Sequence, residues 1–218
     1  TRQFQIYLPL YNGVEKFEIG TTDGAELKAL PARGSVRKPI VCYGTSIMHG
    51  ACSSRPGMAW PSIVGRMLDR EVINFGFSGN GRMELDVGQY LAELDPAVFV
   101  IDCLPNMSPD QVAKRTQPLV RQLRAARKDT PILLVEDRTF TNAWFYKSKL
   151  VEHEQRRKAL RGAFDALQGD GVAGLHYLTG DLLLGRDGEG ATDGSHPNDL
   201  GMIRQAEVVT GSLRPLLR

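Results

Sequence analysis

The sequence is poor in cysteine and has no pattern of cysteines that binds metal or forms a disulfide framework. Its three cysteines, Cys42, Cys52 and Cys103, are an odd number in a chain of 218 residues and have no Cys-x-x-Cys spacing. This argues against a disulfide scaffold, a zinc site and a redox pair. Cys42 and Cys103 lie in apolar runs and are predicted to be buried, whereas Cys52 is a candidate for an accessible thiol.

Long apolar runs and a charge imbalance are also missing. No run approaches the roughly 18 to 20 residues that a membrane-spanning helix needs, and the first residues do not resemble a signal peptide. We expect a soluble protein, either cytoplasmic or exported with its signal removed. The 27 Lys and Arg against 25 Asp and Glu give a net charge of +2, too small for a nucleic-acid-binding surface. We therefore expect no nucleic-acid partner, and the oligomeric state stays open.

The composition is that of an ordinary globular domain, with 42% hydrophobic and 24% charged residues. A chain of this size can bury a substantial core without metal or disulfide cross-links. Residues 1–38 differ from the rest, because apolar residues alternate on both sides of Asn12-Gly13, a strong hairpin turn signal. A short β-hairpin and linker are predicted over 1–38, and the main domain over 39–218.

From Pro39 onward, buried strands alternate with helical patterns. Apolar runs with the length and continuity of buried strands lie at 40–43, 72–75, 98–101, 132–135 and, more weakly, 175–178. Helices are predicted at 59–68, 87–94, 109–127, 149–167 and 198–213. This alternation predicts an α/β fold, with a parallel sheet covered by helices on both faces. In such sheets, functional residues gather at the carboxyl ends of the strands.

Ser46 is the first candidate catalytic residue, because it follows Gly44 on the turn after the first strand. A serine hydroxyl needs an adjacent base that is itself oriented by a third group. Of the four histidines, His196 lies in a glycine-containing loop directly before a helix. There Asp193 can accept the Nδ1 proton and leave Nε2 facing the serine. The ordinary alternatives are that Ser46 caps a turn and that Asp193 and His196 are surface residues.

Acyl transfer also requires donors for the tetrahedral oxyanion, each of which contributes about 3 to 4 kcal/mol to lowering the barrier. Gly79 follows the second strand, and its missing side chain allows its N–H to approach a substrate. Asn106 follows the third strand and can donate from its side-chain amide. Each is individually more typical of a turn or loop residue. Their placement after successive strands favours a shared function.

These residues form an ordered set that resembles the SGNH, or GDSL-like, hydrolase family over residues 39–214. The matching blocks are Gly44-Thr45-Ser46, Asn74-Phe75-Gly76-Phe77-Ser78-Gly79-Asn80, Asn106 and Asp193-Gly194-Ser195-His196. The resemblance implies a flavodoxin-like three-layer α/β/α sandwich with about five parallel strands. It implies Ser46 as nucleophile, His196 as base and Asp193 as the residue that holds the histidine. The implied oxyanion hole consists of the Ser46 and Gly79 N–H groups and the Asn106 side chain, with no metal ion or organic cofactor.

Two blocks depart from the usual family pattern. Thr45 stands where the family usually has aspartate, and Leu104-Pro105-Asn106-Met107 stands where it usually has Gly-x-Asn-Asp. These departures, with Glu136-Asp137-Arg138-Thr139 and Asn142-Ala143-Trp144-Phe145, resemble a bacterial subfamily in which a small β-sandwich precedes the hydrolase domain. Residues 1–38 resemble only the end of such a module, which implies the remnant of an upstream domain.

The expected activity is hydrolysis of a short acyl ester, preferably acetyl, on a carbohydrate. Arg82, Arg138 and Trp144 are the candidate substrate-binding residues, since they are able to hydrogen-bond to sugars or stack on them. The alternatives are a lysophospholipase, thioesterase or acyltransferase, or a non-catalytic binding domain of the same fold. Ser78 remains a rival nucleophile, although no Gly-x-Ser-x-Gly elbow is present.

Overall fold

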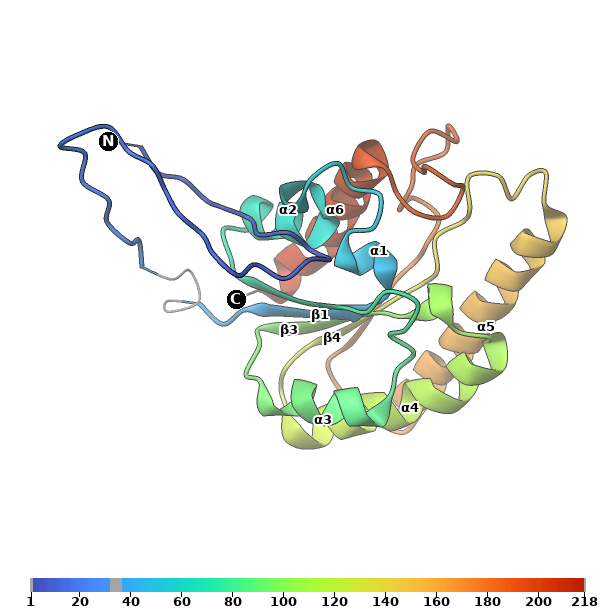
Figure 1. Cartoon of the computed structure of the whole chain (residues 1–218). Helices are drawn as coiled ribbons and strands as arrows, with labels where there is room; N and C mark the ends of the chain where they lie inside the picture. Colours follow the sequence, from blue (N-terminus) through green and yellow to red (C-terminus); the bar gives the residue numbers. More distant parts are fainter. Residues whose placement is uncertain (1, 32–36, 218) are drawn as a thin grey trace.

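A five-stranded parallel sheet forms the centre of the computed structural model, which describes residues 2–31 and 37–217 (Figure 1). The strands are β1 (Ile40–Gly44), β2 (Val72–Gly76), β3 (Val98–Asp102), β4 (Ile132–Val135) and β5 (Leu175–Leu178). Their order in the sheet is β2-β1-β3-β4-β5, and every neighbouring pair is parallel. β2 lies on one side of β1, and β3, β4 and β5 lie on the other side. The strand order therefore reverses between β1 and β3, and open α/β sheets bind ligands at such a point.

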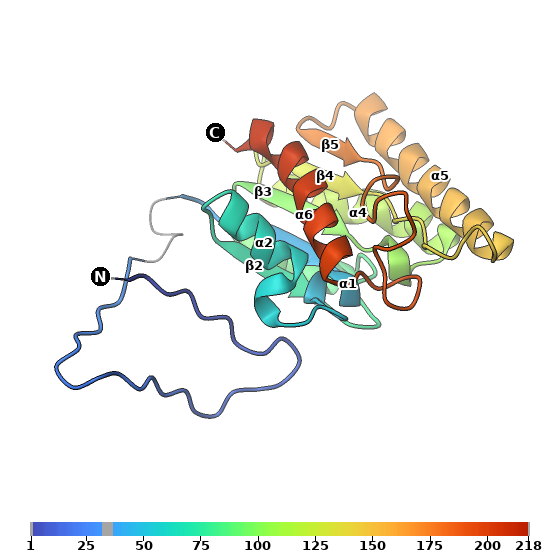
Figure 2. The ribbon, with the colours of Figure 1, turned by 90° about the horizontal axis from the view of Figure 1, so that it is seen from above.

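Helices cover both faces of the sheet and confirm the predicted α/β/α sandwich. They are α1 (Ser46–His49), α2 (Trp60–Met67), α3 (Leu85–Glu93), α4 (Pro109–Ala126), α5 (Lys147–Gly169) and α6 (Asp199–Leu213), with short 3-10 turns η2 (Pro56–Met58), η3 (Leu104–Asn106) and η4 (Arg214–Leu216). Figures 1 and 2 show α1, α2 and α6 on one face and α3, α4 and α5 on the other. Each face has its own buried core, because alternate residues of each strand point to opposite sides.

Local sequence signals explain where the main helices begin and end. All five predicted strands and the five longer predicted helices are present, with boundaries that differ by at most two residues. At the start of α4, the Ser108 hydroxyl accepts from the Gln111 N–H and the Gln111 side chain accepts from the Ser108 N–H. This capping box satisfies two backbone groups that a helix end would otherwise leave unpaired.

None of the helices within the described residues combines the length and the apolar composition that a membrane span needs.

The hairpin prediction for the N-terminal region is wrong for residues 2–31, which contain no strand or helix. Their large apolar side chains are exposed instead of paired, among them Phe4, Ile6 and Phe17. The physical reason is that an isolated two-stranded hairpin is marginal without another surface to cover its apolar face. Most of the linker expected within residues 1–38 falls on 32–36, which lie outside the described residues.

The N-terminal segment contacts the main domain through a few side chains. The Arg66 guanidinium donates to the Tyr7 hydroxyl at 2.9 Å, and the Tyr11 ring stacks on His49 with centroids 4.0 Å apart. The predicted environments of the cysteines are confirmed: Cys42 and Cys103 are buried and Cys52 is exposed.

Candidate active site

The turn after β1 places Ser46 at the start of a helix directly above the sheet. Thr45 caps α1, because its side-chain oxygen accepts from the Ile47 N–H at 3.3 Å. Threonine and aspartate both cap helices in this way, so the departure at Thr45 preserves the local structure. Gly44 is required because a Cβ there would lie 2.6 Å from the backbone oxygen of Asp102 on β3. The result is a nearly buried serine, 8% exposed, at the carboxyl end of β1.

Ser46 and His196, which are 150 residues apart in the sequence, form a continuous hydrogen-bonded chain with Asp193. The Ser46 Oγ lies 2.9 Å from His196 Nε2, and His196 Nδ1 lies 2.7 Å from Asp193 Oδ2. The second Asp193 oxygen accepts from the backbone N–H groups of His196, at 2.7 Å, and Ser195, at 2.9 Å. Because the carboxylate is fixed by these bonds, it holds the histidine with Nε2 directed at the serine.

The loop that carries Asp193 is fixed by its own backbone and by the loop after β4. Gly194 has a positive φ of 89°, and a Cβ there would lie 2.4 Å from the Asn142 side-chain nitrogen. The Thr141 N–H donates to the Gly194 carbonyl at 2.9 Å. Partial burial alone would raise the pKa of Asp193, but the hydrogen bonds from His196 and Ser195 outweigh it and lower this pKa to about 2. Asp193 is therefore ionised at neutral pH, as the partner of a histidine base must be.

The loop between β2 and α3 approaches the turn that carries Ser46 from the neighbouring strand. The Phe77 N–H donates to the Gly44 carbonyl at 2.9 Å, and a Cβ on Gly81 would lie 2.0 Å from the same carbonyl oxygen. Gly79 has a positive φ of 70°, and a Cβ built there would meet nothing within 4 Å. The Gly79 backbone therefore has open space beside it, which its predicted role as an oxyanion donor would need.

Asn106 ends η3, just after β3, and reaches the same loop. Its side-chain nitrogen donates to the Asn80 carbonyl at 2.5 Å. An amide nitrogen carries two hydrogens, so this bond fixes the orientation of the side chain and leaves one donor for another acceptor. Leu104, one of the departures from the family pattern, is fully buried and anchors η3 in the core.

The three remaining histidines, His49, His153 and His176, have structural surroundings of their own. His153 is buried, and its Nδ1 lies 2.8 Å from Asp137 Oδ2. Its Nε2 accepts from the Phe140 N–H at 3.4 Å, so this second Asp–His pair faces backbone and no nucleophile. The His49 Nε2 contacts the Leu10 carbonyl at 2.5 Å, and His176 lies within β5.

Of the three candidate substrate-binding residues, only Trp144 is broadly exposed. Trp144 is 80% exposed, whereas Arg82 is half-buried and its Nη2 donates to the Gly79 carbonyl at 2.9 Å. Arg138 does not lie on the rim: it is 0% exposed, and its Nη2 lies 2.7 Å from both carboxylate oxygens of Asp102. A side chain held in this way is unable to reach a substrate, which corrects the expected role of Arg138.

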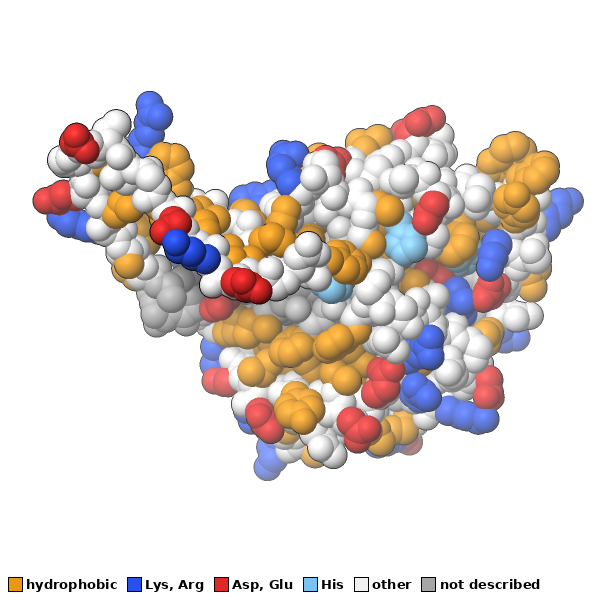
Figure 3. Space-filling view, viewed as in Figure 1, with side chains coloured by type: hydrophobic (Ala, Val, Ile, Leu, Met, Phe, Trp, Pro, Cys, Tyr) orange, Lys and Arg blue, Asp and Glu red, His pale blue; other side chains and the backbone are white. Residues whose placement is uncertain are grey.

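Trp144 belongs to an exposed aromatic turn beside the loop that carries Asp193 and His196. Its ring packs edge-on against Phe145, and the Phe145 ring packs edge-on against Tyr146, with centroids 5.7 and 5.0 Å apart. The N–H groups of Phe145 and Tyr146 both donate to the Asn142 carbonyl, so the turn is tied to the residue that abuts Gly194. Figure 3 shows hydrophobic side chains gathered where α5 begins. We call Trp144, Phe145 and Tyr146 the aromatic turn.

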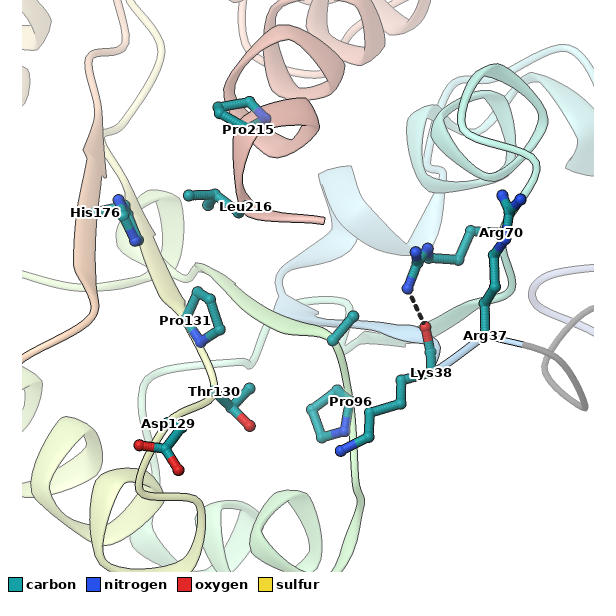
Figure 4. Close-up of a pocket in the computed structure, with 11 residues that line it drawn as sticks. Arg37, Lys38, Arg70, Pro96, Asp129, Thr130, Pro131, His176, Pro215 and Leu216 are labelled. Atoms are coloured by element: carbon teal, nitrogen blue, oxygen red, sulfur yellow. Dashed lines mark hydrogen bonds between the residues drawn. The ribbon is translucent and has the colours of Figure 1, made fainter. Parts of the chain in front are cut away.

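A separate cleft of about 710 Å³ lies at the opposite edge of the sheet (Figure 4). Its lining comes from residues that precede β1, β2, β3 and β4, from His176 on β5 and from η4, and includes Arg70, Pro131 and Leu216. The Arg70 guanidinium points into this cleft and donates to the Lys38 carbonyl at 2.8 Å. The cleft is thus remote from Ser46, which lies at the carboxyl ends of the strands. Within the described ranges, no group of three His, Cys, Asp or Glu residues is arranged to hold a metal ion.

Sequence reasoning missed Tyr43 and Glu84, which tie β1 to the glycine-containing loop. The Tyr43 hydroxyl and the Glu84 carboxylate share a short hydrogen bond, and the Glu84 N–H donates back to the hydroxyl at 3.2 Å. Tyr43 reads in the sequence as one more apolar residue of a buried strand, and Glu84 as a helix-start acid. No local pattern indicates that the two meet.

Comparison with protein-family models and solved structures gives a consistent picture. The GDSL-like lipase/acylhydrolase family model matches residues 37–214. The structure of a GDSL-like lipase from Bacteroides ovatus ATCC 8483, described as putative, is 36% identical, with a TM-score of 0.80. The match covers 83% of this chain and 53% of that one, so the chain spans about half of that protein. A search of curated proteins found no match.

Two more distant structures share the fold. A family two carbohydrate esterase from Clostridium thermocellum is 15% identical with a TM-score of 0.64, over 82% of this chain and 63% of that chain. An aryl esterase from M. smegmatis is 18% identical with a TM-score of 0.64, over 83% of this chain and 100% of that chain. At these identities the likeness shows the architecture alone.

Proposed function

Because this chain belongs to the GDSL-like lipase/acylhydrolase family, we propose that it is a serine esterase with Ser46 as nucleophile. The observation that carries the proposal is the chain of hydrogen bonds from Ser46 Oγ through His196 to Asp193, at 2.9 and 2.7 Å. A nucleophile, a base within hydrogen-bonding distance and a group that orients the base are the parts that acyl transfer needs.

The reaction proceeds in two halves on these residues. Ser46 Oγ attacks the ester carbonyl carbon while its proton passes to His196 Nε2, and Asp193 stabilises the imidazolium. The tetrahedral oxyanion accepts hydrogen bonds from the N–H groups of Ser46 and Gly79 and from the free amide hydrogen of Asn106. Collapse breaks the bond to the alcohol oxygen, which takes the proton from His196. A water molecule, deprotonated by His196, then hydrolyses the acyl-enzyme and regenerates Ser46.

The proposed substrate is a short acyl ester, preferably acetyl, on a carbohydrate. Support for the sugar comes from the aromatic turn, whose Trp144 ring is 80% exposed beside the catalytic loop. Exposed aromatic faces stack on the apolar faces of sugar rings, since both surfaces are flat and lose water on contact. The fold is shared with a family two carbohydrate esterase, which is compatible with this substrate class.

A lipid or other long-chain acyl ester is the second candidate. Leu150 and Val151, which follow the aromatic turn near the start of α5, are 39% and 49% exposed. Exposed apolar side chains gathered in one region often mark a binding surface, and such a surface suits an acyl chain as well as a sugar. This observation supports a lysophospholipase or a long-chain thioesterase or acyltransferase.

Acyl-chain profiling separates the two candidates. We expect kcat/KM for p-nitrophenyl acetate to exceed that for the decanoate ester by at least about tenfold, the size of effect that poor fit of a few methylenes produces. Acetylated xylo- and cello-oligosaccharides should release acetate, measured enzymatically against a Ser46→Ala blank. Faster cleavage of decanoate esters or acyl-CoA than of acetylated sugars would exclude the carbohydrate proposal.

Replacing Asp193 with asparagine should lower kcat by roughly 10³- to 10⁴-fold, because the amide presents a donor to His196 Nδ1 and favours the wrong tautomer. The Asn oxygen is still able to accept from the backbone N–H groups of Ser195 and His196, so the loop should remain folded. Asp187→Asn is the matched control, since Asp187 is another loop aspartate, paired with Arg204. Equal kcat for Asp193→Asn and wild type would exclude Asp193 from the mechanism.

A further inference from the structure

The loop from Phe77 to Glu84, which carries Gly79, is held at its far end by a buried tyrosine of β1. Tyr43 is 0% exposed, and its hydroxyl donates to Glu84 Oε2 in a short hydrogen bond. The Glu84 N–H donates to the same hydroxyl at 3.2 Å. The hydroxyl therefore serves as donor and acceptor to a single residue, which fixes both the backbone and the side chain of Glu84.

Glu84 passes this restraint back along the loop to Arg82. Its Oε2 also accepts from the Arg82 N–H at 2.6 Å. Burial alone would raise the pKa of Glu84, but the hydrogen bonds from Tyr43 and Arg82, together with the charge of Arg115, lower it below its ordinary value. Glu84 is thus an ionised acceptor at neutral pH, and hydrogen bonds to an ionised group are stronger than those between neutral groups.

Arg82 connects this restraint to Gly79. Its Nη2 donates to the Gly79 carbonyl at 2.9 Å, and its own carbonyl accepts from Arg115 Nη1 at 3.0 Å. Gly79 has no side chain of its own to fix it, and its surroundings leave space even for a Cβ. Its orientation therefore depends on bonds made by neighbouring residues.

We propose that Tyr43 and Glu84 are positioning residues that hold the Gly79 N–H in line for the oxyanion, acting through Arg82. Neither side chain touches the reacting atoms. Tyr43 lies on β1 directly before Gly44, Thr45 and Ser46, so the same strand orients the nucleophile and the donor loop. This inference rests on the proposed esterase function, because it assigns Gly79 to the oxyanion hole.

Removing the tyrosine hydroxyl tests this arrangement. In Tyr43→Phe, kcat for p-nitrophenyl acetate should fall about tenfold with KM within about twofold, because a misplaced oxyanion donor weakens the transition state more than the bound ester. An alkyl boronic acid forms a tetrahedral adduct with a catalytic serine, and its Ki should rise about as much as kcat/KM falls. Glu84→Ala should behave like Tyr43→Phe, whereas Glu84→Gln, which retains an acceptor oxygen, should recover part of the loss.

Tyr177→Phe is the matched control. Tyr177 donates to Glu136 at 2.6 Å, and Glu136 accepts from the Gly180 N–H at 2.9 Å, so this pair has the same chemistry on a different loop. Its kcat and boronate Ki should stay within about twofold of wild type, while both tyrosine variants lose a comparable amount of thermal stability.

The possible results lead to separate conclusions. If the wild-type enzyme is active and Tyr43→Phe has the same kcat and boronate Ki as wild type, the positioning role is overturned and the esterase function stands. Equal losses in Tyr43→Phe and Tyr177→Phe also overturn it, because they indicate a general effect on stability. A wild-type enzyme that hydrolyses no ester and binds no boronate overturns the proposed function together with this inference.

Discussion

Replacing Ser46 with alanine is expected to reduce kcat on p-nitrophenyl acetate by at least about 10⁴-fold, the loss typical of a missing triad nucleophile. The remaining hydrolysis should come from water in a site that still stabilises the oxyanion. The helix cap belongs to Thr45, and the Ser46 side chain bonds to His196. Thermal unfolding and circular dichroism should therefore match the wild-type protein.

Ser78→Ala is the control for Ser46→Ala, since Ser78 is the rival nucleophile and lies in the glycine-containing loop after β2. Ser78 is exposed and, among the described residues, its hydroxyl has no histidine partner. Its replacement should leave kcat within about twofold, as expected for a surface site that makes no contact in the transition state. Loss of turnover in Ser78→Ala with retention in Ser46→Ala would reverse the assignment.

Replacing Arg138 with methionine should destabilise the fold by about 3 to 5 kcal/mol, the usual cost of leaving one partner of a buried ion pair without the other. Asp102, at the end of β3, would lose both contacts with the guanidinium and retain only the Gln205 amide, at 3.1 Å. Burial already raises the pKa of Asp102 against the opposing effect of Arg138. Urea unfolding monitored by circular dichroism measures the change.

The double variant Asp102→Leu with Arg138→Met is the control for this experiment. It removes both charges, and apolar replacement of a buried pair is often close to neutral, so most of the stability should return. Kinetics provide the other comparison. If Arg138→Met left the stability unchanged and raised KM, Arg138 would contact the substrate, and its structural role as the partner of Asp102 would be excluded.

The fold was predictable because its signals are local. The continuous apolar runs of β1 and β3 are buried along their whole length, as parallel strands with helices on both faces require. The capping box at Ser108 defined where α4 begins. The hairpin prediction at Asn12-Gly13 was wrong because alternation describes what a segment is able to do, whereas pairing depends on a surface that covers it.

Part of the candidate site was also predictable, for a topological reason. Ser46 follows β1, and the carboxyl ends of parallel strands share one edge, so pairing with His196 required only that the last loop reach that edge. The partners of Arg138 were not predictable in this way. An arginine after a strand reads as a rim residue, and its burial depends on Asp102, which is 36 residues away in the chain. The link between Tyr43 and Glu84 is equally non-local.

The most direct test of the central claim is intact-mass and peptide-mapping mass spectrometry after incubation with a fluorophosphonate. We expect one covalent adduct per chain, on the peptide that contains Ser46, and no adduct in Ser46→Ala or after prior treatment with the boronic acid. An adduct on Ser78, or an unmodified protein under conditions that label a known serine esterase, would contradict it.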